Sequence, residues 1–499
     1  MIGILEVLTP SIILISLALI TVPVMGIVRR NSKGHRSLSL VWVLAVFSAL
    51  TVGIARLYFE YYTQVEGQPF VTVFLVGGER AHLSSSFLVD AVSMYMAIVY
   101  LIVGLISCLY SVFYIKLESE LSERYFALLF MILGSVMAAT FSGDLLTLFI
   151  FWEASAAGSC FLIVYGKKPE SIEACLKYLV MIIVASGFIV FGLSMIYGLV
   201  GSLSFWTVRE ALISLSDKRL LIVAFAFVAC GYAIETAVVP FHMWLPDAYT
   251  ASPSSSSAFL SAIVDQASYY VFMRVLVYIL TPQVVLNWPL ALAVFSAVTM
   301  TVGNLFALAQ DNVKRMISYI CVADIGYNLV AITSVKSLGV MGNLFFFLVG
   351  GMTTALAFMT VGIFNNLGLR ELKEFSGVGR RFPMTSLALV VAVFSFSGIP
   401  PASGFVAKYM VFTAAIEAEM AWLAVVGVLN SLLQTAYLFR LVHFMYAGRT
   451  RKRGEGKEPR DLLVAVYALV ALIVILGLYP SLALTVIYPA AQQLNLLVP

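Results

Sequence analysis

Long apolar segments that carry almost no charge are the feature that most constrains how this chain can fold. The segments 11–28, 87–114 and 462–487 are of this kind. A helix rises about 1.5 Å per residue, so each segment is long enough to cross the roughly 30 Å of hydrocarbon in a bilayer. Charged residues make up 11% of the chain and hydrophobic residues 61%, whereas a soluble domain has about 25% charged residues. The sequence therefore predicts an all-α polytopic membrane protein.

The succession of apolar segments predicts about fourteen transmembrane helices. Between the second and third of them, residues 65–79 alternate enough to predict a short hairpin at the membrane surface. We expect the spans at 11–29, 37–55, 87–115, 124–142, 144–165, 173–200, 219–238, 255–280, 287–308, 312–334, 337–364, 382–412, 421–447 and 462–488.

Lys and Arg residues in the loops predict the orientation of the spans, because such residues stay mainly on the cytoplasmic side. Most of them fall in alternate loops, on the side opposite to the N-terminus. We therefore expect a multi-pass protein of the cytoplasmic membrane with both termini outside. The basic run at 449–460 has two interpretations, because it can fix the topology or bind anionic lipid or a peripheral protein.

The sequence carries no recognisable cofactor motif. Its cysteines lie isolated inside apolar segments, and we expect them to be small packing residues. They are Cys108, Cys160, Cys175, Cys230 and Cys321. The histidines are too scattered to suggest a metal site, and no glycine-rich nucleotide loop is present. We expect no cofactor or metal in this chain itself, and no nucleic-acid partner.

A few ionisable residues interrupt the apolar spans. A charge near the bilayer centre costs about 2.5–3.5 kcal/mol even on insertion scales, so each such residue is a candidate for function. The candidates are Glu153, Lys177, Glu235, Asp265, Asp324 and Lys408. Acids and bases in a medium of low dielectric stabilise one another, and moving a proton or cation through one pair perturbs the next.

Several of these residues also have a purely structural interpretation. Lys177 lies near the inner end of its span, so its long side chain can reach the membrane surface. Asp265 can hydrogen-bond the polar run Ser254–Ser257, and Asp324 can bond the neighbouring backbone. Glu153 and Lys408 lie nearer the middle of their spans, and there we favour a functional role.

Two spans contain prolines that predict broken helices. The residues concerned are Pro240 and Pro246 in the first span and Gly398, Pro400 and Pro401 in the second. Proline leaves backbone carbonyls unpaired, which is tolerated at membrane depth where the backbone is buried in protein or lines a wet cavity. Paired broken helices point to a transport path. His242 lies in the first break, where it can exchange protons near neutral pH or simply pack.

Four segments resemble a known family, the antiporter-like subunits shared by respiratory complex I, membrane-bound hydrogenase and sulfur-reductase complexes and Mrp cation/proton antiporters. They are SGDLLTLFIFWEAS (142–155), PFHMWLPDAY (240–249), GNLFALAQDNVKRMISY (303–319) and FSGIPPASGFVAKYMVF (396–412). The resemblance implies two inverted five-helix repeats, each with a broken helix, at 124–280 and 287–447. Residues 1–123 would form an N-terminal three-helix segment with an outer loop, and 448–499 a basic inner loop and a last helix.

The same resemblance implies roles for individual residues. Glu153 matches the charged partner of the first repeat, with Lys177 near it, and His242 matches the histidine of the broken helix. Lys408 matches the terminal lysine of the second half-channel. The chain departs from the family where Glu235 replaces a central lysine, where Gln266 beside Asp265 replaces another, and where Asp324 replaces a histidine. These changes favour a modified or sodium-linked path, or a first half that only supports the fold.

Three functions therefore remain open from the sequence. The leading hypothesis is a subunit that translocates H⁺ or Na⁺ within a redox-driven complex, whose Fe–S clusters would lie in a peripheral arm made of partner subunits. The alternatives are a subunit of an Mrp-type Na⁺/H⁺ antiporter and a non-conducting scaffold. In each case we expect other membrane subunits as partners and no electron transfer by this chain itself.

Overall fold

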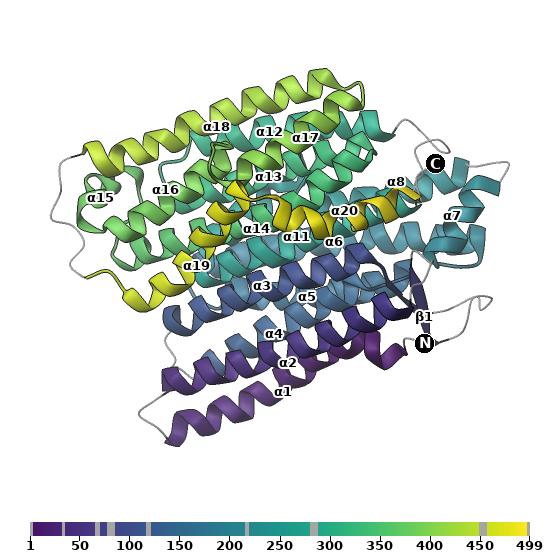
Figure 1. Cartoon of the computed structure of the whole chain (residues 1–499), viewed down its shortest axis with the longest axis horizontal. Coiled ribbons are helices and arrows are strands. Elements are labelled where there is room, and N and C mark those ends of the chain that lie inside the picture. The colour runs from purple at the N-terminus through teal and green to yellow at the C-terminus, as the bar shows by residue number, and fades with distance from the viewer. Residues whose placement is uncertain are drawn as a thin grey trace.

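The computed structural model describes residues 3–31, 35–64, 70–76, 85–115, 121–214, 219–279, 288–448 and 457–496. Its helices run roughly alongside one another and form a single bundle (Figure 1). The predicted all-helical membrane architecture is confirmed: in the described part of the chain, 11 helices are long and apolar enough to cross a membrane. The total of fourteen spans stays a prediction.

The first half of the chain contains the following elements. They are α1 (Ile4–Asn31), α2 (His35–Gln64), β1 (Val71–Val76), β2 (Ser85–Val89), α3 (Ala91–Tyr114), α4 (Leu121–Thr140), α5 (Leu145–Val164), α6 (Pro169–Val200), α7 (Phe205–Ser214), α8 (Arg219–Glu235), η1 (Phe241–Met243), α9 (Trp244–Ala251), α10 (Ser254–Phe259), the π-helix η2 (Leu260–Val264), α11 (Asp265–Arg274) and the π-helix η3 (Val275–Ile279).

The second half contains α12 (Trp288–Leu308), α13 (Val313–Ser334), α14 (Ser337–Asn366), η4 (Leu372–Phe375), α15 (Val378–Arg381), α16 (Pro383–Ser397), α17 (Ser403–Glu417), α18 (Ala421–Ala447), α19 (Arg460–Leu478) and α20 (Ser481–Leu496). Within 124–280 the break lies at the end of the fourth expected span, between α8 and α9, and within 287–447 it lies inside the fourth, between α16 and α17. The division into two inverted repeats stays a prediction.

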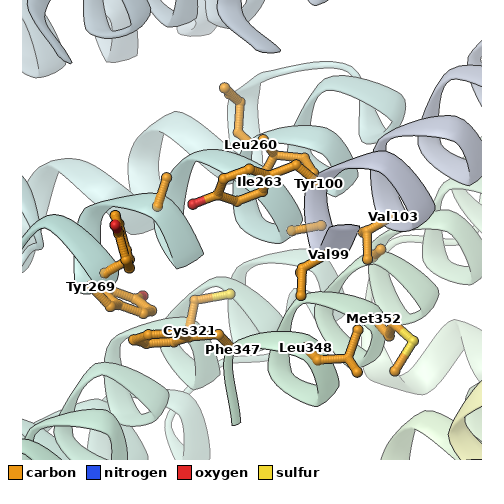
Figure 2. Close-up of a cluster of buried hydrophobic side chains, with 14 of the residues drawn as sticks. Val99, Tyr100, Val103, Leu260, Ile263, Tyr269, Cys321, Phe347, Leu348 and Met352 are labelled. Carbon is orange, nitrogen blue, oxygen red and sulfur yellow. The ribbon is translucent and has the colours of Figure 1, made fainter. Parts of the chain in front are cut away.

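Helices α13 and α14 lie at the centre of the bundle, since their apolar windows are 100% buried. Figure 2 shows how the parts of the chain meet beside them, with α3, η2, α11, α13 and α14 contributing buried side chains. The labelled residues are Val99, Tyr100, Val103, Leu260, Ile263, Tyr269, Cys321, Phe347, Leu348 and Met352. Because close packing rather than the hydrophobic effect holds helices together in lipid, this shared cluster fixes the two halves against each other.

Two expected boundaries differ in the structure. The hairpin does form, but β1 pairs in antiparallel fashion with β2 at 85–89, so the third span begins at Ala91 and not at residue 87; residues 65–69 and 77–79 of the expected hairpin lie outside the described part. The last expected span divides into α19 and α20. Proline at position 480 explains this division, because it cannot supply the backbone N–H that a continuous helix needs.

The expectation of five isolated cysteines is wrong for two of them. Cys160 and Cys175 form a disulfide whose Cα atoms are 5.6 Å apart. They meet because α5 and α6 are joined by a tight turn, which brings residues at equal distances from the turn to the same level. Cys108, Cys230 and Cys321 are free.

Candidate functional site

The first broken helix is interrupted between α8 and α9. Pro240 has no N–H, and Ala237 adopts a left-handed conformation with φ of 53°. Neighbouring side chains satisfy the backbone groups that the break exposes: Trp244 Nε1 donates to the carbonyl of Ile234 at 3.1 Å, and Thr299 Oγ1 accepts from the N–H of Val239 at 3.2 Å. The backbone groups at the break are therefore hydrogen-bonded inside the protein, as backbone at membrane depth must be.

Glu235 ends α8 and is 4% exposed. The indole Nε1 of Trp152 on α5 donates to its Oε2. The carboxyl of Glu153 lies near enough to Glu235 for their negative charges to repel, and Ser186 Oγ of α6 donates to Glu153 Oε1 at 2.7 Å. Two neighbouring carboxylates are less unfavourable when one of them carries a proton. The pair is thus a place where a proton can be held inside the bundle.

Asp265, at the start of α11, lies across a small cavity from Glu235. The cavity has a volume of about 20 Å³, and Glu235, Tyr249 and Asp265 all line it. A space of roughly 10–15 Å³ is enough for one water molecule that has polar partners. The hydroxyl of Tyr249 donates a hydrogen bond to Asp265 Oδ1. This space therefore has room for a water that joins the two carboxylates.

Asp324 of α13 continues the series. It is buried at 5% exposure and lies near enough to Asp265 for their negative charges to repel. On its other side it attracts Lys408, and the two line a second small cavity of about 10 Å³. The central helix thus carries a carboxylate between the acids of the first half and the lysine of the second.

Lys408 on α17 occupies a polar pocket formed by the second broken helix. Its Nζ donates to the carbonyl of Phe396 at 2.6 Å and to Gln434 Oε1 at 2.7 Å. It also lies 4.2 Å from the ring centroid of Tyr327. The Phe396 carbonyl is free to accept because α16 ends there and Gly398 turns the chain with φ of 67°. The break thus provides a backbone acceptor for the ammonium.

The remaining predicted residues lie apart from this series. His242 is buried and its ring lies tilted against that of Phe306, with the ring centroids 6.1 Å apart. Within the described part, neither ring nitrogen makes a well-formed hydrogen bond, although one lies near the Pro240 carbonyl. Lys177 does not join Glu153. It pairs with Glu173 and with Asp247, each at 2.9 Å, at a cleft near the helix ends. Gln266 donates to the carbonyl of Ser261 at 3.3 Å.

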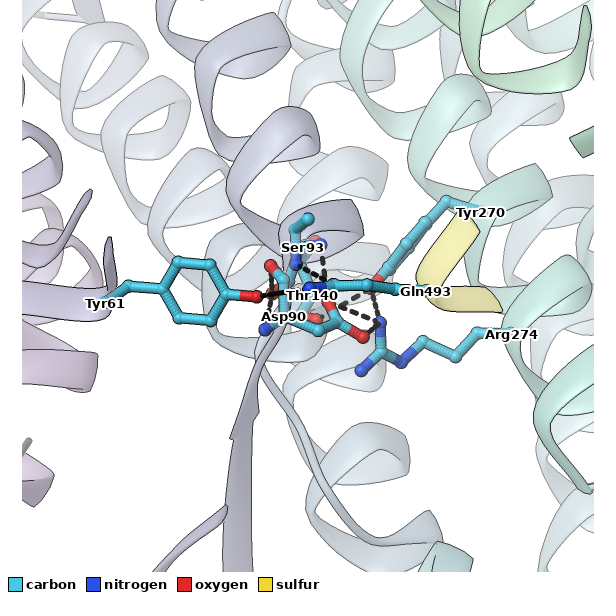
Figure 3. Close-up of polar contacts among 8 residues, drawn as sticks. Tyr61, Asp90, Ser93, Thr140, Tyr270, Arg274 and Gln493 are labelled. Atoms are coloured by element: carbon cyan, nitrogen blue, oxygen red, sulfur yellow. Dashed lines mark hydrogen bonds and ion pairs between the residues drawn. The ribbon is translucent and has the colours of Figure 1, made fainter. Parts of the chain in front are cut away.

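Sequence reasoning missed several partners of these residues. Trp152, Tyr249 and Gln434 are ordinary membrane residues by composition, and the only signal for Trp152 is its place beside Glu153. It also missed a buried ion pair between Arg274 and Asp90, 3.1 Å apart, which Figure 3 shows with Tyr270 and Gln493 around it. Both are fully or nearly fully buried. Charge at the end of an apolar span was the signal that could have found them.

No group of three or more His, Cys, Asp or Glu side chains in the described ranges is arranged to hold a metal ion. The ionisable side chains of the series are instead the acids Glu153, Glu235, Asp265 and Asp324 together with Lys408, and they join the two broken helices through α13. Fold and site together define a membrane protein with an internal ionisable series.

Comparison with known proteins identifies the family of membrane proteins that this chain matches. The family described as NADH:quinone oxidoreductase/Mrp antiporter, TM matches residues 142–434, and the N-terminal family of complex I chain 5 matches residues 76–126. The F(420)H(2) dehydrogenase subunit N of Methanosarcina mazei is 33% identical over 80% of this chain and 83% of its own length. The NADH-quinone oxidoreductase subunit N of Trichlorobacter lovleyi is 30% identical over 98% of this chain and 96% of its own.

Solved structures agree in fold. A chain of the Mrp complex from Dietzia superposes with a TM-score of 0.85 at 22% identity, covering 97% of each chain. A chain of the archaeal membrane-bound sulfane sulfur reductase superposes with a TM-score of 0.84 at 24% identity, again covering 97% of each. The chain belongs to the family of NADH:quinone oxidoreductase/Mrp antiporter membrane subunits, and the resemblance inferred from its motifs is confirmed.

Proposed function

We propose that this chain is an ion-translocating membrane subunit of a redox-driven complex, and that the ion it carries is the proton. The observation that carries the proposal is the buried series from the Glu153–Glu235 pair through Asp265 and Asp324 to Lys408. Ionisable groups in a membrane interior are costly and normally mark ion pathways. Similarity to an F(420)H(2) dehydrogenase subunit N over 80% of this chain, and to an NADH-quinone oxidoreductase subunit N over 98%, supports a redox-driven complex.

Protons fit the chemistry of the series better than sodium ions do. Glu153 and Glu235 repel each other when both are charged and so favour binding one proton, and the two small cavities have room for single waters that would pass protons onward. Lys408 ends the series and can exchange a proton with Asp324 through a change of its pairing. Sodium ions would instead require several oxygen ligands around one point.

The mechanism follows from the charges. When Asp324 approaches or leaves Lys408, the ammonium gains or loses its counter-charge, and the proton affinity of both groups changes. The same change alters the repulsion between Asp324 and Asp265. A proton taken up at one end of the series therefore favours release at the other. Partner membrane subunits and a peripheral redox arm would supply the driving force, in a cytoplasmic membrane with both termini outside.

Substitution of Lys408 tests the proposal. The purified complex with its partner subunits is reconstituted into lipid vesicles, electron donor and acceptor are added, and pH change inside the vesicles is followed with a dye, with and without sodium. We expect Lys408→Met to lower coupled proton movement by roughly 10²-fold. Lys336→Met is the matched control, because Lys336 lies outside the series and donates only to the carbonyl of Glu417 at the helix ends.

Three results would contradict the proposal. Unchanged coupling in Lys408→Met would indicate a scaffold. A strict requirement for sodium, with sodium moving in place of protons, would assign a sodium path. A purified assembly without any redox subunit would favour an Mrp-type antiporter, in which the same substitution abolishes exchange driven by an ion gradient.

A further inference from the structure

A large polar cleft opens at the same end of the bundle as the start of α6 and α13. It has a volume of about 670 Å³. It is bounded by the end of α3, the turn between α5 and α6, the link between α9 and α10, the start of α13 and the segment after α14. The positions of Lys and Arg in the sequence predict that this end faces the cytoplasm. The translocation series described above does not use this cleft.

The charges in the cleft do not balance. Five cations and three carboxylates line it, namely Lys168, Lys177, Lys314, Arg315 and Arg370 against Glu170, Glu173 and Asp247. Lys177 bridges Glu173 and Asp247, and Arg315 NH2 pairs with the other oxygen of Asp247 at 2.8 Å. Two of the three acids are therefore already neutralised by two of the cations.

The other three cations share the cleft with one remaining acid, Glu170, and outnumber it. Lys314 is 5% exposed, and Lys168 and Arg370 are both near enough to repel it. Its ammonium donates to the carbonyl of Ser252. Within the ranges that the structure describes, no carboxylate forms an ion pair with Lys168, Lys314 or Arg370. A buried ammonium facing two further cations is unfavourable unless an anion joins them.

An apolar surface begins at the rim of the same cleft. Ile172, Leu176 and Val180 follow one another at helical spacing on α6 and are about half exposed, beside the cleft residues Glu173 and Lys177. A ligand that fits both features has an anionic head and an apolar tail. Basic pockets between transmembrane helices on the cytoplasmic side bind phosphate head groups of lipids, and Arg and Lys form strong charge-assisted hydrogen bonds with phosphate oxygens.

We propose that this cleft binds the phosphate head group of an anionic phospholipid, held by Lys168, Lys314 and Arg370, with the acyl chains along the exposed apolar face of α6. The lipid completes the charge balance of the cleft. It also holds together the ends of α6, α13 and α14, which enter the bundle from different parts of the chain.

The test measures lipid affinity in the full chain. Phosphatidylglycerol or phosphatidylcholine is added to the detergent-purified protein, and bound lipid is counted by native mass spectrometry. We expect wild type to retain phosphatidylglycerol in preference to phosphatidylcholine. The double variant Lys168→Gln/Arg370→Gln should bind phosphatidylglycerol roughly 30-fold more weakly. Both residues are exposed, so the variant keeps the fold, whereas Lys314→Gln serves as a second variant at the buried position.

Lys373→Gln is the matched control, because Lys373 is an exposed lysine near Arg370 that does not line the cleft. It should leave phosphatidylglycerol affinity unchanged. A parallel titration with inorganic phosphate distinguishes the sources of the phosphate group: displacement of lipid by millimolar phosphate assigns the cleft to the free anion. Equal affinity of wild type and double variant would overturn the proposal. So would loss of a partner subunit from the variant complex with lipid retention unchanged, because the cleft would then bind protein.

Discussion

Glu235 occupies a position where the family resemblance implied a lysine, and its surroundings explain how a carboxylate is accommodated there. A lysine would need an acid beside it, and Glu153 would supply that charge. Glu235 instead accepts a hydrogen bond from the indole N–H of Trp152 and lies near Glu153. The exchange converts an ion pair into two neighbouring acids, and their repulsion favours a proton on one of them. The pair therefore acts as one titrating unit.

Substitutions in this pair should accordingly be non-additive. We expect Glu153→Gln and Glu235→Gln each to lower coupled proton movement by roughly 10²-fold, because each removes one of the two acids that favour binding a proton there. The double variant should be no slower than the slower single variant, since the unit is already lost. Vesicle proton uptake measures this. Glu210→Gln, at an exposed acid of α7 outside the series and outside the cavities, is the control and should behave as wild type. Multiplicative losses in the double variant would mean that the two acids act separately.

Arg274 and Asp90 form a buried ion pair in which each charge neutralises the other. Asp90 also caps α3, where its side chain accepts from the N–H of Ser93 at 2.7 Å, and Arg274 donates to the hydroxyl of Tyr270 at 2.6 Å. Removing one charge leaves the other buried without its partner, which is strongly destabilising, whereas removing both is tolerated much better.

We therefore expect Arg274→Met to lower the free energy of unfolding by about 3–5 kcal/mol. The double variant Asp90→Asn/Arg274→Met should recover most of this loss, because asparagine keeps the cap on α3 and carries no charge. Thermal unfolding in detergent provides the comparison. If the double variant were less stable than Arg274→Met alone, the loss in Arg274→Met could not be attributed to the unneutralised charge of Asp90.

Helix crossings depend on glycine where two backbones approach closely. Gly192 on α6 and Gly231 on α8 face the opposite helix, and an added Cβ would lie 2.7 Å from the carbonyl oxygen of Ala224 and 2.8 Å from that of Ala185, respectively. Small residues at such crossings are the usual means of packing helices in lipid. The two glycines also position Glu235, which ends α8.

Gly231→Ala should lower the free energy of unfolding by about 1–3 kcal/mol, because the added methyl forces α6 and α8 apart. The control is Gly198→Ala on α6, where an added Cβ meets nothing within 4 Å. Thermal unfolding of the two variants measures the difference. Equal stability of Gly231→Ala and Gly198→Ala would show that the crossing relaxes without cost.

The helices and their breaks could be predicted from sequence because hydropathy and proline act locally. The breaks at Pro240 and at Pro400–Pro401 interrupt the helices where proline requires it. The site partners could not be predicted in the same way, because Trp152 reaches Glu235 across 83 positions of the chain and the contact depends on how α5 meets α8. The disulfide was missed for a related reason, since it depends on the turn that sets α5 against α6.

At the scale of the whole molecule, the end of the chain packs against its beginning. Gln493 of α20 accepts the backbone N–H of Ala91 at 2.9 Å and donates to the hydroxyl of Tyr61 at 2.8 Å. The last helix thus joins α2 to the start of α3, next to the Asp90–Arg274 pair (Figure 3). The start of α1 and the end of α20 also lie on the same side of the bundle (Figure 1).

Loss of this link should weaken the whole bundle. We expect Gln493→Ala to lower the free energy of unfolding by about 1–3 kcal/mol, because the N–H of Ala91 loses its acceptor. Gln492→Ala is the neighbouring control, since Gln492 is exposed and contacts only Tyr488 on its own helix. Thermal unfolding in detergent separates the two. Identical melting of both variants would mean that water replaces the lost acceptor.

The position of Gln493 also bears on the order of biogenesis. Gln493 supplies the acceptor at the start of α3, although 402 positions of the sequence separate it from Ala91. The early helices can enter the bilayer one after another, but their arrangement at that end is finished only after α20 has been synthesised. Until then, the N–H of Ala91 lacks this acceptor.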